Sequence, residues 1–145
     1  LLVAWPVAHT HADLTVLDEQ TGTLWTGDLL FREHIPVLDG SLKGWLAVVN
    51  TLKNTAVKKI IPGHGPPGDN WAEVMTAQEN YLNNLLQQTR KAIAGGVFME
   101  DAINTIGAGE KDRHRDTGGC FETLAIDSQG AFVFPREVKC LRAKL

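Results

Sequence analysis

The sequence is poor in the features that mark several common protein classes. No apolar run in its 145 residues approaches the roughly 20 residues of a transmembrane helix, so a membrane-spanning protein is not expected. Aspartate and glutamate (17) outnumber lysine and arginine (14), and the net charge of −3 offers no basic surface for nucleic acid. Cys120 and Cys140 lie far apart and form no CxxC pair. This spacing is compatible with one disulfide and with two free thiols, so the cysteines do not indicate the cellular compartment.

The chain opens with apolar residues 1–5 and without methionine. No basic segment or cleavage site accompanies them, which is unlike a signal peptide. An opening strand with nothing before it to pair with predicts that the beginning of a longer chain is absent, together with any targeting signal. The composition, 43% hydrophobic and 21% charged, is typical of one globular domain.

The stretch over residues 9–28 is the most informative in the chain. Residues 14–18 alternate in polarity, a turn follows, and residues 23–26 are β-branched and aromatic, which together predict a β-hairpin. A hairpin brings its outer ends together, so His9 and Asp28 are expected to be neighbours. An imidazole and a carboxylate at the rim of a sheet are typical ligands of a zinc-type ion.

Further elements alternate along the chain and make α/β the expected fold class. Hydrophobic periodicity predicts helices from Ser41, as N-cap, to about residue 51, and from Asn70, as N-cap, to just before Gly95. The remaining predicted elements are a strand over residues 1–8 broken by Pro6, a strand over residues 57–61 ended by Pro62, a short helix over residues 99–106, and a last hairpin with strands 121–126 and 131–134.

His64 lies in a backbone-permissive loop, residues 63–68, directly after a predicted strand. His9 and Asp28 also lie where a strand meets a loop. Layered α/β folds usually build their sites from loops at strand ends. The placement therefore indicates that these three side chains share one site.

Three short motifs resemble the metallo-β-lactamase fold superfamily. They read AHTHADL at residues 8–14, WTGDLLF at residues 25–31 and IPGHGP at residues 61–66, and they look like the third, fourth and fifth metal motifs of that family, in order. The stretch PVLDGSLKGWL at residues 36–46 looks closer still to a subgroup, the zinc metallohydrolases linked to quinoprotein and sulfur-oxidation systems. The resemblance covers about residues 3–106.

This resemblance implies a fold and a division of the chain. Residues 1–106 would be the C-terminal half of an αββα sandwich, and residues 107–145 a divergent tail. By the same resemblance, His9 would bind one zinc, Asp28 would bridge two zincs as the catalytic residue, and His64 would bind the second. A zinc-bound hydroxide, available near neutral pH because zinc lowers the pKa of water to about 7, would attack a small-molecule ester, thioester or lactam.

The family's main zinc motif, HxHxDH, is not complete anywhere in the chain. His9, His11 and Asp13 imitate it, but Leu14 stands at its sixth position and the chain continues as a strand. His11 is therefore expected to lie outside the ligand shell, and Asp13 supports the ligands or is structural. With the HxHxDH half absent, the chain would hold one zinc or none instead of the family's two.

That absence keeps a second interpretation open, a non-catalytic fragment that dimerises or binds a partner, because half a sandwich leaves one apolar sheet face uncovered. The other conspicuous side chains have ordinary explanations. His34 and His114 are expected at the surface, Trp45 and Trp71 in the core, and Cys120 without an activating base.

Overall fold

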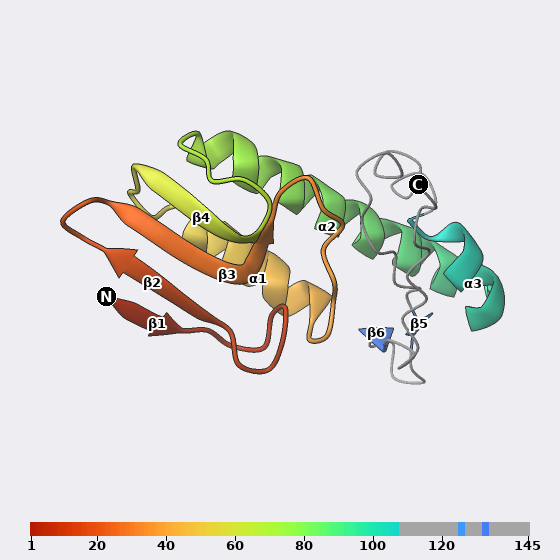
Figure 1. Cartoon of the computed structure of the whole chain (residues 1–145). Coiled ribbons are helices and arrows are strands. Elements are labelled where there is room, and N and C mark those ends of the chain that lie inside the picture. The colour runs from red at the N-terminus through yellow and green to blue at the C-terminus, as the bar shows by residue number, and fades with distance from the viewer. Residues whose placement is uncertain (108–124, 127–131, 134–145) are drawn as a thin grey trace, which may run out of the picture.

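The main sheet has four strands in the order β1-β2-β3-β4 (Figure 1). The computed structural model describes residues 1–107, 125–126 and 132–133. In chain order the elements are β1 (Leu2–Ala4), β2 (Leu14–Asp18), β3 (Thr23–Phe31), α1 (Leu42–Leu52), β4 (Lys59–His64), α2 (Trp71–Ala94), α3 (Met99–Thr105), β5 (Ala125–Ile126) and β6 (Phe132–Val133). The expected α/β class is confirmed.

The sheet is mixed. β1, β2 and β3 pair antiparallel, with Leu2 opposite Val16 and Val16 opposite Trp25, whereas β3 and β4 run parallel. The parallel pair is connected through α1, as a parallel crossover requires. The carboxyl ends of β3 and β4 therefore meet at the same edge of the sheet.

Helices α1 and α2 pack against one face of the sheet and bury the core (Figure 1). Ser41 caps α1 by accepting a hydrogen bond from the Gly44 amide, and Asn70 caps α2 by accepting one from the Glu73 amide, as predicted. Trp45 of α1 is fully buried, which confirms its expected place in the core. Trp71 is partly buried against the same core.

Several predicted boundaries are wrong. Pro62 does not end its strand, because β4 is an edge strand of the four-stranded sheet and tolerates a residue that cannot donate. The second hairpin strand does not stop at residue 26 but continues as β3 to Phe31, with an irregular register around Gly27. The first strand is confined to Leu2–Ala4.

Toward the C-terminus, β5 and β6 pair antiparallel, which confirms the last predicted hairpin. His114, Cys120 and Cys140 lie outside the described residues, as does most of the predicted tail, residues 107–145. The division of the chain near residue 106 stays a prediction. Of the helices described, none combines the length and the apolar character that crossing a membrane requires.

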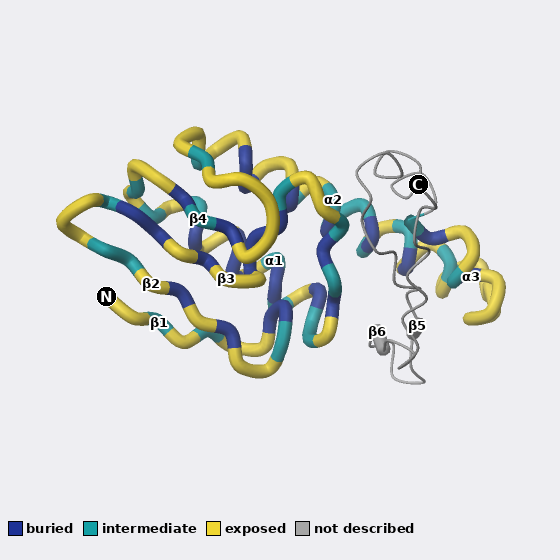
Figure 2. Tube along the Cα trace, in the orientation of Figure 1, coloured by how far each residue is buried: buried dark blue, intermediate teal, exposed yellow. Residues whose placement is uncertain are grey.

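The face of the sheet that turns away from the helices carries exposed apolar side chains. Exposed and buried residues alternate over residues 14–16 of β2 and 24–27 of β3 (Figure 2). The outward set, called here the open sheet face, consists of Leu2, Leu14, Val16, Trp25 and Ile61. Of these, Leu2 is 70% exposed and Leu14 54%, so the described residues leave this face open to solvent.

Candidate functional site

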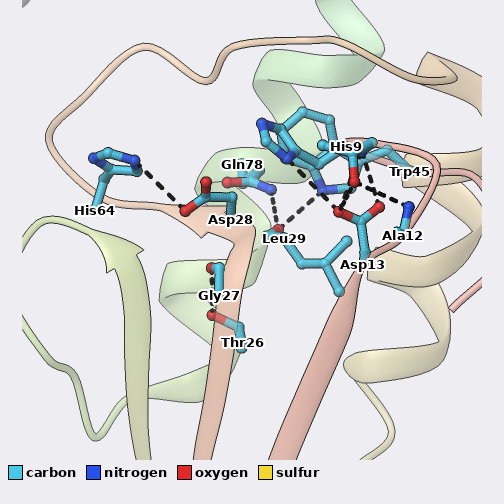
Figure 3. Close-up of polar contacts among 11 residues, drawn as sticks. His9, Ala12, Asp13, Thr26, Gly27, Asp28, Leu29, Trp45, His64 and Gln78 are labelled. Carbon is cyan, nitrogen blue, oxygen red and sulfur yellow. Dashed lines mark hydrogen bonds and ion pairs between the residues drawn. The ribbon is translucent and has the colours of Figure 1, made fainter. Parts of the chain in front are cut away.

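Asp28 and His64 face one another at the edge where β3 and β4 end (Figure 3). The His64 Nε2 lies 3.5 Å from the Asp28 Oδ1, and both side chains are about half exposed, at 50% and 45%. The parallel register explains the meeting, since Gly27 pairs with Pro62 and Phe31 with His64. Two of the three predicted site residues are thus neighbours at a solvent-accessible strand end.

Gly63 makes room for the Asp28 carboxylate. A Cβ atom at position 63 would overlap the Asp28 Oδ1 and the backbone of Gly27. Only a residue without a side chain lets β4 approach β3 this closely. The glycine before the predicted ligand therefore shapes the site through close approach.

The segment that follows Asp28 is held by two buried side chains from the helices. The Leu29 carbonyl accepts hydrogen bonds from Trp45 Nε1 at 2.9 Å and from Gln78 Nε2 at 2.6 Å. The Phe31 amide donates to Gln78 Oε1 at 2.8 Å. Gln78 is 3% exposed, so its amide acts as a clamp on the end of β3. The sequence carried one signal of this role, a polar residue on the apolar stripe of the helix.

His64 is held from a second side by Phe31. Their ring centroids are 4.6 Å apart and the ring planes are inclined by only 11°, a stacked arrangement. Stacking on a buried ring restricts the imidazole to the orientation in which it meets Asp28.

His9 lies in the loop between β1 and β2 and is buried, with 7% exposed. The loop is tied to the start of α1, because the Asp39 amide donates to the His9 carbonyl at 3.0 Å. Asp13 closes it from within by accepting hydrogen bonds from the amide and hydroxyl of Thr10. Gly44 of α1 allows this approach, since a Cβ there would overlap a main-chain oxygen of the loop.

The His9 ring packs among aromatic side chains. Its centroid lies 5.1 Å from that of Trp45 and 5.6 Å from that of Phe31. The nearest carboxylate oxygen, Asp13 Oδ1, is 3.7 Å from the His9 Nδ1, which is too far for a hydrogen bond. Within the described part of the chain the Nδ1 is therefore a buried polar atom without a hydrogen bond, an arrangement that is costly unless another group satisfies it.

Of the three predicted ligands, Asp28 and His64 thus form a pair with each other, whereas His9 lies next to Asp13. His9 and His64 both contact the Phe31 ring, and no hydrogen bond or ion pair joins His9 to Asp28. Asp28 and His64 lie together in the close-up, and Asp13 lies beside His9 (Figure 3). The expectation that the hairpin makes His9 and Asp28 neighbours stays a prediction.

The fit to zinc can be judged from this geometry. Imidazole and carboxylate are the right donor types, and zinc takes three or four such ligands. Over the part of the chain that the structure describes, no three histidine, cysteine, aspartate or glutamate side chains converge as a metal site would require. The pair supplies two donors, so no catalytic step through a metal ion follows from this arrangement.

The comparisons with known proteins give matches only among solved structures. No family model and no curated protein matches the chain. The chain is similar to a metallo-β-lactamase from Pontibacter korlensis, with 25% identity and a TM-score of 0.49 over 57% of this chain and 41% of that one. It is also similar to TMB-1, with 19% identity and a TM-score of 0.46 over 53% of this chain and 37% of that one.

These structures are metallo-β-lactamases, the superfamily that the three sequence motifs resemble. The chain spans about two fifths of their length. The closer likeness to the quinoprotein and sulfur-oxidation subgroup stays a prediction.

Proposed function

We propose that this chain contributes to a zinc-dependent hydrolase of the metallo-β-lactamase superfamily that acts on a small ester, thioester or lactam. The observation that carries the proposal is the Asp28–His64 pair, since two residues from separate motifs meet 3.5 Å apart at the shared end of parallel strands. Strand ends of this kind are where α/β folds place their ligands.

Three features of the site support a ligand role for these side chains. His64 is oriented by Phe31 on one side and by the Asp28 carboxylate on the other. Gly63 has no side chain, so it leaves space for that carboxylate. His9 makes no side-chain hydrogen bond among the described residues, and its ring packs on the same Phe31 ring that holds His64.

Zinc titration of the purified chain, followed by calorimetry and elemental analysis, tests the proposal. We expect stoichiometric zinc, and Asp28→Ala and His64→Ala are each expected to weaken binding at least tenfold because each removes one direct donor. His11→Ala is the matched control, since His11 is exposed and takes part in none of the site contacts.

Hydrolysis is measured in parallel on a panel of p-nitrophenyl acetate, a chromogenic cephalosporin and a thioester. Loss of turnover in Asp28→Ala with retention in His11→Ala supports the proposal. A wild-type chain that binds no zinc and hydrolyses none of the panel contradicts it.

The open sheet face favours a second candidate function, self-association. Asp18, Thr23 and Lys59 form one row across β2, β3 and β4. A twofold axis lying over β3 and parallel to it would place Asp18 opposite Lys59 of the partner subunit, and the reverse by symmetry. Trp25 would lie at the axis, in the centre of the apolar patch. This charge complementarity makes a second copy the occupant that the face fits.

Light scattering over a range of protein concentrations tests the dimer. Trp25→Asp is expected to give monomers, because it places a charge at the apolar centre, and Lys59→Glu to weaken the dimer through repulsion of Asp18. Lys43→Glu, an equal charge change on the exposed surface of α1, serves as the control. A wild-type chain that stays monomeric at every concentration rules this candidate out.

A further inference from the structure

His34 lies beside the Asp28–His64 pair although its surroundings in the sequence give no reason to expect it there. Its ring centroid is 6.0 Å from that of His64. The preceding residue, Glu33, has a φ of 59°, in the left-handed region that a residue with a side chain rarely adopts. Such a conformation costs free energy and persists only where the surrounding structure imposes it.

The loop that carries His34 is tied to the loop that carries His64. The Arg32 amide donates to the His64 carbonyl at 3.0 Å, and the Arg32 Nη1 donates to the Pro66 carbonyl at 2.7 Å. Hydrogen bonds of Arg32 therefore join the loop that carries His34 to the loop that carries His64.

A main-chain contact selects the tautomer of His34. The His34 Nδ1 lies 2.9 Å from the Arg32 carbonyl oxygen. A carbonyl oxygen only accepts hydrogen bonds, so the Nδ1 carries the hydrogen, and in the neutral ring the Nε2 is left as an acceptor. His34 is exposed, and among the described residues this Nε2 has no hydrogen-bond partner.

We propose that His34 is a substrate-binding residue whose Nε2 accepts a hydrogen bond from a hydroxyl or amide N–H next to the carbonyl that is hydrolysed. The proposal rests on the hydrolase function above and narrows its substrate class to molecules that carry such a donor.

Kinetics on a matched substrate pair tests this role. The pair consists of the S-phenyl thioesters of lactic acid and of its O-methyl ether, which share the scissile bond and differ in one donor. His34→Ala is expected to raise KM for the hydroxy substrate about five- to tenfold, the value of one hydrogen bond, and to leave kcat and the methoxy substrate nearly unchanged.

Two further variants distinguish the loss of a hydrogen-bond acceptor at position 34 from the loss of side-chain volume. The terminal amide of glutamine reaches the position of the histidine Nε2, whereas that of asparagine reaches only the position of Nδ1. His34→Gln is therefore expected to restore much of the discrimination between the hydroxy and methoxy thioesters, and His34→Asn is not. His11→Ala, the exposed histidine remote from these contacts, should behave as wild type on both substrates.

Equal effects of His34→Ala on both thioesters would overturn the proposal, and so would a loss of bound zinc in that variant, which would make His34 a metal ligand. If the wild-type chain hydrolyses neither thioester, binding is tested by NMR, from the chemical shifts of the His34 imidazole as each compound is added. A shift on adding the hydroxy compound alone refutes the hydrolase and keeps the binding role, whereas no shift refutes both.

Discussion

Replacing Gln78 with methionine tests how the end of β3 is held in place. Methionine is similar in length and shape, so the change removes the two hydrogen bonds of the amide and leaves the packing largely intact. The Phe31 amide then stays buried without a partner, at a cost of about 1–3 kcal/mol. The Leu29 carbonyl keeps its bond from Trp45 Nε1, so the second loss costs about 1 kcal/mol.

The expected loss in the free energy of unfolding is about 2–3 kcal/mol once the extra apolar burial of methionine is allowed for. With a urea m-value of about 2 kcal/mol per molar, the unfolding midpoint should fall by about 1–1.5 M. Urea titration followed by tryptophan fluorescence measures this shift.

Thr89→Val is the matched control on the same helix. Thr89 is also buried, and its hydroxyl donates to the Leu85 carbonyl at 2.8 Å, but valine leaves no buried donor behind. Its cost should stay below about 1 kcal/mol. If Gln78→Met unfolds at the wild-type midpoint, or if Thr89→Val costs as much, the clamp does not stabilise the site as argued.

Three other substitutions have a clear expected direction. Gly63→Ala should lower zinc affinity at least tenfold, because its Cβ displaces the Asp28 carboxylate, and calorimetry checks it. Gly44→Ala should destabilise the fold by about 1–3 kcal/mol in urea unfolding despite the better helix propensity of alanine, because its Cβ overlaps a main-chain oxygen. The hydrogen bond from the Thr21 hydroxyl, with that from the Gln20 amide, lowers the pKa of Asp18 below 3.8. The resulting stability is present above that value and is lost as pH falls through the folded pKa, so Thr21→Val should raise the pKa of Asp18 in an NMR titration.

Local signals in the sequence predicted the helices and the first hairpin well. The caps Ser41 and Asn70 bond to amides three residues on, so the information lies within one turn of chain. The strand boundary predicted at Pro62 was wrong because it depends on distant residues. A proline ends a strand only if a neighbouring strand needs its missing N–H, and neighbouring strands come from other parts of the chain.

The site was predicted by residue type and order but not by arrangement. Asp28 and His64 were expected at strand ends, and the parallel pairing of β3 with β4 brings them together. His9 and His64 both pack on the Phe31 ring, and no spacing in the chain reveals the place of a ring. His34 is exposed, as expected, but its place beside His64 also depends on how the chain folds.

By itself the sequence determined what depends on a few consecutive residues, namely turns, caps, apolar stripes and the three motifs with their histidines and aspartate. Only the tertiary structure decided which strands are neighbours, which face of the sheet stays open and which side chains share the rim. The physical reason is how far apart in the sequence the interacting residues lie. Hydrogen bonds within a turn are set by adjacent residues, whereas strand pairing and side-chain packing are set by segments that meet only after the chain has folded.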